Sequence, residues 1–218
     1  MNRSIKAVVF DIDGTLSPDI SWTKITHELG SSVPDHERIY ENFKERKLTL
    51  EEGQEAMLLL WRGEGGVLRR EKLVGILDKW ILKNDVIEVF RFLKRMGILT
   101  CLITGSIDLF AEIIAKKVDA DFWFANTELI WDKNNNLENL IFEPDAGKKK
   151  LNQFFEFCSQ NNLRPQECLV VGDDSNDIQL FKTTGRGVAV ESSTSYVLDD
   201  VAWKKISKLK EIKGLFLP

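Results

Sequence analysis

Two acidic segments of this 218-residue chain directly follow apolar segments, and both contain the residue types of a metal site. DIDGT occupies positions 11–15 after the apolar AVVF, and GDDSND occupies positions 172–177 after CLVV. Carboxylates crowded together repel one another unless they are protonated or bind a cation. Carboxylate oxygens suit Mg²⁺, which usually keeps several waters and also contacts substrate phosphates. The two segments therefore predict a magnesium site, provided that the fold brings them together.

Asp11 and Asp13 stand two positions apart at the end of a predicted strand, so their side chains project from the same side. One carboxylate can attack phosphorus as a nucleophile, while the other protonates the leaving oxygen and later deprotonates water. Gly14 lets the backbone turn and approach a ligand closely. Taken alone, the same three residues are equally typical of a turn closed by an aspartate hydrogen bond.

A third segment, TGS at 104–106, stands where an apolar run opens into a predicted helix. Its hydroxyls and free backbone N–H groups are typical of an anion cradle, although a simple helix cap explains them without any function. Three lysines at 148–150 open another predicted helix. Because cations oppose the dipole at a helix N-terminus, a nearby anion would explain one of them.

Apolar runs at 5–10, 98–103 and 168–171 predict strands buried on both faces, as in a parallel sheet. Helical periodicity lies between them, over Asp85–Arg95 and around Phe154 and Phe157. This alternation predicts an α/β fold built from right-handed βαβ units, in which the loops after the strands share one ligand-binding edge. We also expect short strands at 188–190 and 201–203 and a hairpin over 128–141.

The stretch between the first two strands is far longer than one crossover helix needs, so a further unit must fold within it. Its apolar residues recur at helical spacing. We predict an α/β core domain of residues 1–16 and 84–218, with residues 17–83 inserted as a helical cap domain. The alternative is an extra layer of core helices without a functional role.

Composition excludes several classes of protein. The chain has a formal charge of −4 and a pI near 5.4, whereas nucleic-acid-binding proteins usually carry an excess of basic residues. The longest apolar run, 56–61, is far too short to span a membrane, and we expect a cytoplasmic protein without a membrane partner. Three cysteines without a CxxC spacing predict buried, reduced thiols, and we expect His27 and His36 at the surface.

DIDGT, TGS, a lysine near 150 and GDDSND, in that order, resemble the four motifs of the haloacid dehalogenase-like superfamily. The helical insertion after the first motif resembles the cap of its phosphoserine-phosphatase-like branch. The resemblance implies a three-layer, Rossmann-like parallel sheet with a small all-helical cap, a Mg²⁺ cofactor and phosphomonoester hydrolysis through an aspartyl-phosphate. It also implies roles for individual residues. Asp11 would be the nucleophile and a metal ligand, Asp13 the acid/base and a ligand, and Asp173 and Asp177 metal ligands. The phosphate-binding residues would be Thr104, Gly105, Ser106, Asn176 and Gly14.

The motif lysine fits more than one register. Counting back from Asp173 without a gap favours Lys150, whereas a position in the loop before the predicted helix favours Lys148, the first of the three lysines. We assign the catalytic role to Lys150, which would neutralise the phosphoryl oxygens and hold Asp11 ionised, and place Lys148 among the phosphate-binding residues.

The resemblance favours a phosphatase, because dehalogenases lack the second aspartate and transport ATPases replace it. We expect a small phosphomonoester metabolite as substrate and a monomer or homodimer that binds no nucleic acid. Phosphoserine phosphatases carry a cap glutamate where this chain has Ile20, which argues against phosphoserine, and Arg62 is our candidate for reading a substrate carboxylate. The alternatives are a phosphoserine phosphatase proper, a phosphotransferase or mutase of the same fold, and a non-enzymatic scaffold.

Overall fold

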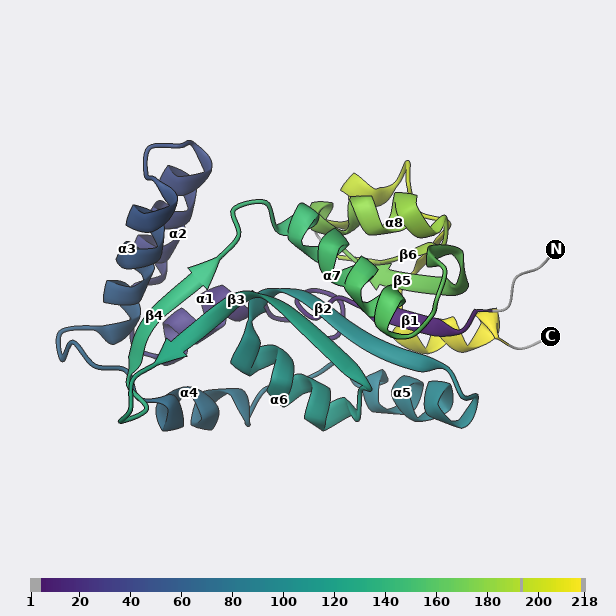
Figure 1. The fold of residues 1–218 in the computed structure, drawn as a ribbon, viewed down its shortest axis with the longest axis horizontal. Helices are drawn as coiled ribbons and strands as arrows, with labels where there is room; N and C mark the ends of the chain where they lie inside the picture. The colour runs from purple at the N-terminus through teal and green to yellow at the C-terminus, as the bar shows by residue number, and fades with distance from the viewer. Residues whose placement is uncertain (1–4, 193, 217–218) are drawn as a thin grey trace.

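A seven-stranded sheet with the strand order β4-β3-β2-β1-β5-β6-β7 forms the centre of the computed structural model, which describes residues 5–192 and 194–216 (Figure 1). Its strands are β1 (Ala7–Phe10), β2 (Leu99–Ile107), β3 (Phe122–Trp131), β4 (Leu137–Phe142), β5 (Cys168–Gly172), β6 (Gly187–Val190) and β7 (Lys204–Ile206). Strand β4 pairs antiparallel with β3, and the other pairs are parallel. The predicted α/β class is confirmed.

Helices cover both faces of the sheet, which explains why the central strands are apolar throughout. In β1, Val8 and Phe10 face one hydrophobic cluster, and Ala7 and Val9 face the other. The first cluster includes residues of α5 (Val86–Arg95) and α6 (Asp108–Val118), and the second includes residues of α7 (Ala146–Gln160) and α8 (Ile178–Thr184). Short 3₁₀ helices complete this part: η1 (Pro165–Glu167), η2 (Ser175–Asp177), η3 (Ser195–Leu198) and η4 (Leu209–Leu215).

Between β1 and α5 the chain is helical, as the sequence predicts for residues 17–83. It forms α1 (Ser21–Glu28), α2 (Val33–Lys44), α3 (Leu50–Arg62) and α4 (Arg70–Leu77). Side-chain caps start two of them: Ser32 accepts from the backbone of Asp35, and Thr49 and Glu52 form a reciprocal capping box. Helices α2 and α3 stand beside β4 at one end of the molecule (Figure 1). That this segment is a separate domain stays a prediction.

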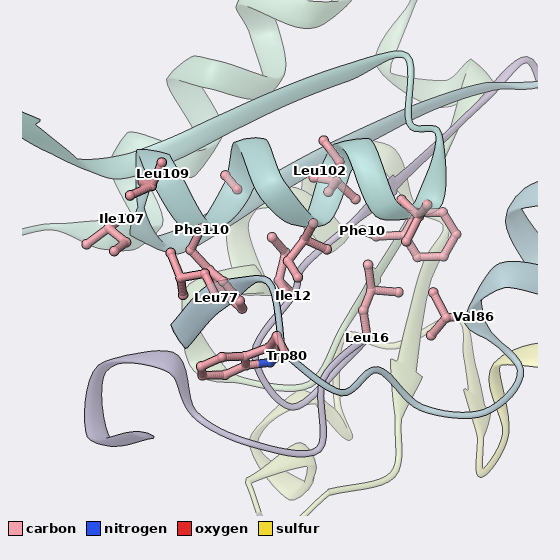
Figure 2. Close-up of a cluster of buried hydrophobic side chains, with 14 of the residues drawn as sticks. Phe10, Ile12, Leu16, Leu77, Trp80, Val86, Leu102, Ile107, Leu109 and Phe110 are labelled. Carbon is pink, nitrogen blue, oxygen red and sulfur yellow. The ribbon is translucent and has the colours of Figure 1, made fainter. Parts of the chain in front are cut away.

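Packing joins the helical segment to the sheet. Figure 2 shows Leu77 and Trp80 beside Phe110 of α6, and the Trp80 and Phe110 ring centroids are 4.7 Å apart. Trp80 Nε1 also donates to Ser17 Oγ at 2.9 Å, next to the loop that follows β1. The end of the segment is therefore anchored in the core, and the β3–β4 turn binds it through the hydrogen bond from the Arg70 N–H to the Asn135 carbonyl.

The predicted hairpin over 128–141 is confirmed, because β3 and β4 pair antiparallel with Glu128 opposite Ile141. Strand β3 is longer than predicted and begins at Phe122, since its first half pairs in parallel with β2 before its second half pairs with β4. Residues 201–203 are not a strand. The backbone N–H of Val201 donates to Leu198 in a turn, and β7 begins at Lys204, which pairs with Val188.

Two further predictions concern cysteines and membranes. Cys101, Cys158 and Cys168 are buried and free, as predicted. None of the helices in the described part of the chain is long and apolar enough to cross a membrane.

Candidate active site

The loops that follow β1, β2 and β5 meet at one edge of the sheet and bring the acidic segments together. One carboxylate oxygen each from Asp11, Asp173 and Asp177 lies within 4.8 Å of the other two, and all three residues are buried. A cavity of about 470 Å³ opens there, lined by Asp11, Asp13 and Asp173 at the sheet edge and by helices α1, α2 and α3 farther out. Its size is typical of a small-molecule site.

Lys150 reaches the centre of this cluster from the second turn of α7. Its Nζ lies 2.9 Å from Asp11 Oδ1 and 2.7 Å from Asp177 Oδ1, and it donates to Asn176 Oδ1 at 2.8 Å. Burial disfavours the charged ammonium, but Asp11 and Asp177 outweigh that effect and raise the pKa of Lys150 above its usual value. Lys150 is therefore a permanent cation between two carboxylates.

Lys148 is not brought to the cavity. Asp145 caps α7 by accepting from the Lys148 backbone N–H at 2.9 Å, which sets where the helix starts. Two positions apart on an α-helix is about 200° of rotation, so Lys148 and Lys150 point in opposite directions. Lys150 is buried and Lys148 is exposed, which corrects the expectation that Lys148 binds phosphate.

The carboxylates of the site are costly to keep ionised in the metal-free protein. Burial raises the pKa of Asp11 well above its ordinary value, although Lys150 opposes the shift. Burial raises the pKa of Asp13 to about 7, against hydrogen bonds from Ser21. The pKa of Asp173 is also raised by burial. A bound cation would reverse these penalties, because it favours the charged forms.

Asp13 interacts with the helical segment. Ser21, the first residue of α1, donates from Oγ to Asp13 Oδ2 at 2.5 Å and lies 2.5 Å from Ser106 Oγ. The other carboxylate oxygen of Asp13, Oδ1, has no hydrogen-bond partner within residues 5–192 and 194–216. Ser21 could not be predicted, because no motif places a serine eight residues after Asp13.

The TGS segment and the turn after β1 line the remaining side of the site. Thr104 Oγ1 accepts from the Ser106 backbone N–H at 3.1 Å, so this N–H is not free to form the predicted anion cradle. Gly105 lines the cavity. Gly14 has a φ of 71°, and a Cβ there would lie 2.1 Å from Asp173 Oδ2. Only glycine therefore fits between the β1 turn and Asp173.

Two further polar groups contact the turn and Asp173, and neither was singled out from the sequence. Thr15 Oγ1 donates to Asp173 Oδ1 at 2.9 Å. Lys83, at the end of the helical segment, donates from Nζ to the Gly14 carbonyl and from its backbone N–H to the Leu16 carbonyl. A role for Thr15 could have been predicted, because it belongs to the DIDGT motif. Lys83 could not, because only the folding of the helical segment brings it to the site.

Two predictions about the helical segment are wrong. The Arg62 guanidinium donates to the backbone carbonyls of Leu137 and Glu138 in β4, so it is not available to read a substrate carboxylate. His36 is buried rather than exposed. Its Nδ1 lies 2.8 Å from Thr26 Oγ1, and burial lowers the pKa of His36.

Comparisons with known proteins agree with this geometry. A model of the haloacid dehalogenase-like hydrolase family matches residues 5–185, and the chain belongs to that family. The chain is 24% identical to the phosphoserine phosphatase of Methanocaldococcus jannaschii, with 87% of each protein covered. It is 26% identical to the phosphoserine phosphatase of Archaeoglobus fulgidus over 95% of its own length and 58% of that relative's length.

The structural comparison gives the same fold. The solved structure of a phospho-aspartyl intermediate analogue of phosphoserine phosphatase superposes with a TM-score of 0.74 at 23% identity, covering 97% of this chain and 99% of that one. The chain is thus a phosphatase of the haloacid dehalogenase-like family, in the phosphoserine-phosphatase-like branch.

The residues present fit a magnesium ion. Four carboxylates, those of Asp11, Asp13, Asp173 and Asp177, gather at this sheet edge, where the Lys150 ammonium contacts two of them, and Asp13 Oδ1 lacks a partner in the described part of the chain. All of these donors are oxygens, which Mg²⁺ prefers.

Proposed function

We propose that this chain is a Mg²⁺-dependent phosphomonoester hydrolase that acts on a small phosphorylated metabolite through a phosphorylated Asp11. The observation that carries the proposal is the buried Lys150 ammonium, held between Asp11 and Asp177 at the base of a cavity that Asp13 also lines. A buried cation beside a carboxylate at a cavity wall suits a substrate that brings further negative charge.

The carboxylates of Asp11 and Asp173 and the backbone carbonyl of Asp13 would hold the metal, with Asp177 in support. Two contacts of Asp177 support that role: its Oδ2 accepts from the Asp173 backbone N–H at 3.2 Å, and its Oδ1 accepts from Lys150 Nζ at 2.7 Å. When bound, Mg²⁺ supplies positive charge to the phosphoryl oxygens. Thr15 fixes the rotamer of Asp173 through its hydrogen bond to Oδ1.

In the first step the Asp11 carboxylate attacks phosphorus, the bond from phosphorus to the ester oxygen breaks, and protonated Asp13 gives its proton to the leaving alkoxide. In the second step Asp13 takes a proton from water, which attacks the phosphoryl group and releases inorganic phosphate and Asp11. Burial of Asp13 raises its pKa, which favours the protonated form that the first step requires. Lys150, Asn176, Thr104 and Gly105 would position the phosphoryl oxygens, and Ser106 would contribute through its hydroxyl, because Thr104 holds its backbone N–H.

We further propose that phosphoserine is not the preferred substrate. Ile20 lines the cavity, and its apolar side chain cannot pair with the amine of phosphoserine. Arg62 is bound to β4 and cannot pair with the carboxylate. The relatives named phosphoserine phosphatase share the fold and the branch, and their names do not decide the substrate of this chain.

The test is release of inorganic phosphate from a panel of phosphorylated metabolites by the purified full chain, with Mg²⁺ and with excess chelator. Asp11→Asn should abolish turnover without unfolding the protein, and Asp200→Asn, at an exposed aspartate outside the cavity, is the matched control. A phosphoryl adduct on Asp11 should be found by mass spectrometry after rapid acid quenching. Full activity in chelator, or a tenth of wild-type activity in Asp11→Asn, would contradict the mechanism.

A further inference from the structure

The part of the cavity away from the carboxylates is apolar and aromatic. Helices α1, α2 and α3 and strand β4 contribute to it, together with the residue before α1. These lining side chains are Ile20, Trp22, Ile39, Phe43, Met57 and Phe142, with Tyr40 at the rim. They form the wall that any group attached to the phosphate must contact.

The aromatic rings of this wall brace one another edge to face. Phe43 and Phe142 have ring centroids 5.5 Å apart at an interplanar angle of 88°, and Trp22 and Phe142 are 6.5 Å apart at 79°. Gly53 in α3 gives the Phe43 ring its place, because a Cβ there would lie 3.2 Å from Phe43 Cδ2. Such pairs favour a fixed arrangement of the rings. The wall is thus preformed for an apolar occupant.

Positive charge is absent from the lining of the cavity in the described part of the chain, where no lysine or arginine contributes. The ammonium of Lys150 lies beside the carboxylates instead of at the wall, and Asp11 and Asp177 already hold it. His36, which does line the cavity, is neutral near pH 7 because burial lowers its pKa. A carboxylate on the substrate would therefore have no cation to meet at this wall.

The amide of Asn126, which lines the cavity, brings no positive charge to it. Its Nδ2 donates one N–H to the Glu143 carbonyl at 3.1 Å, and its Oδ1 is buried without a partner among the residues described. At most one neutral N–H of this amide therefore remains for a ligand, which does not replace the cation that a carboxylate would need.

Two apolar side chains remain in water at this cavity. Ile20 is 52% exposed and Tyr40 is 59% exposed, and both belong to the lining. An apolar ligand that covers them gains free energy by removing their surface from water, whereas a charged ligand would lose its hydration there.

We infer that the alcohol part of the substrate is a bulky, uncharged, apolar or aryl group, and that phosphomonoesters carrying a carboxylate are excluded. This inference rests on the proposed phosphomonoester hydrolysis and names its substrate class. The cavity has room for such a group, since 470 Å³ falls within the usual range for small-molecule pockets.

The first experiment compares esters of primary alcohols, so that leaving-group chemistry varies little. For ethyl, butyl and hexyl phosphate, kcat/KM should rise about fourfold with each added methylene that the wall buries. 2-Phenylethyl phosphate should exceed phosphoserine and 3-phosphoglycerate at least tenfold. If either carboxylated ester is best, the inference is overturned. If choline phosphate is best, the wall binds a cation through its aromatic faces, and the inference is equally overturned.

Binding is measured separately from chemistry with phosphonates, which cannot be hydrolysed at the P–C bond. With Mg²⁺ present, 2-phenylethylphosphonate should bind at least tenfold more tightly than phosphonoacetate by calorimetry. If no ester in the panel is hydrolysed, the proposed function fails, and this ratio still decides the inference about the wall. Equal binding of the two phosphonates overturns the inference while leaving hydrolysis untouched.

A variant at the rim links the preference to the wall. Ile20→Ser should lower kcat/KM for 2-phenylethyl phosphate several-fold and leave methyl phosphate, which does not reach the wall, unchanged. Ile81→Ser is the matched control, because Ile81 is 66% exposed and lies outside the lining. An equal loss for both esters in Ile20→Ser would contradict the assignment.

Discussion

Replacing Lys150 by methionine tests whether the buried ammonium holds the carboxylate cluster together. Methionine has a similar length and no charge, so the change removes the cation without opening a large cavity. The Lys150 ammonium contacts Asp11, Asp177 and Asn176 at 2.7–2.9 Å, and its side chain is fully buried. The variant therefore leaves two buried carboxylates without their shared partner.

The magnitude follows from this burial. Breaking a buried ion pair by removing one partner typically costs about 3–5 kcal/mol, because a buried charge is left uncompensated. We expect a loss of about 4 kcal/mol in the free energy of unfolding of the metal-free protein near pH 8. For a chain of this size that corresponds to a fall of roughly 8–16 °C in the melting temperature.

The cost should depend on pH in a defined direction. Burial already raises the pKa of Asp11 and Lys150 lowers it, so the variant raises the folded-state pKa of Asp11 further. Between the pKa of Asp11 in the unfolded chain and its higher pKa in the folded variant, the folded variant binds more protons than the unfolded chain. The free energy of unfolding of the variant therefore falls as pH rises through that window. The loss relative to wild type should thus be smaller at pH 5.5 than at pH 8.

Urea unfolding of both proteins in chelator at pH 5.5 and pH 8 measures these differences. Lys148→Met, at the exposed lysine of the same helix, should change stability little. The double variant Lys150→Met, Asp177→Asn should recover part of the loss, since one of the two stranded carboxylates is gone. A loss below about 1 kcal/mol at pH 8, or an equal loss at both pH values, would refute the reasoning.

Three more predictions follow from contacts of the site and the helical segment. Ser21→Ala removes a hydrogen bond to the acid/base carboxylate worth about 1.5–3 kcal/mol, so kcat should fall about tenfold and the acidic limb of its pH profile should move up by about one unit. Gly14→Ala places a Cβ 2.1 Å from Asp173 Oδ2, so a Mg²⁺ titration should show weakened binding, whereas Gly30→Ala, also at positive φ but in open space, should bind normally. His36 is buried and its pKa is lowered, so only the unfolded chain takes up a proton there as pH falls through the unfolded histidine pKa near 6.5. Wild type should therefore lose stability relative to His36→Gln between pH 7.5 and 5.5, as measured by urea unfolding.

The parts of the fold that were predictable are those where burial leaves a simple pattern. Strands β1, β2 and β5 lie between two helical layers, so each appears as a continuous apolar run. The start of β3 lies outside the predicted hairpin, although FWFA at 122–125 is itself an apolar run of four residues. These residues are less buried than those of β1, with Trp123 39% exposed, and their parallel pairing with β2 becomes visible only in three dimensions.

The site divides in the same way. Asp11, Asp13, Asp173 and Asp177 follow strands whose ends must share one edge, so their proximity was predictable from topology. Counting back from Asp173 already favours Lys150 over Lys148, and the start of α7, which the Asp145 cap sets, gives the physical reason. Ser21 reaches Asp13 through the path of the helical segment, and no local pattern encodes that path.

The charged cluster and the group that fills the cavity are linked through the exclusion of water. Coulomb interactions between Lys150 and Asp11 are strong only where water is excluded, and both side chains are buried. The same exclusion raises the cost of the surplus carboxylates, which the raised pKa values of Asp11, Asp13 and Asp173 record. An apolar substrate group that fills the cavity would therefore strengthen the electrostatic interactions on which the chemistry depends, whereas a carboxylated group would add one more anion to a site that already has too many.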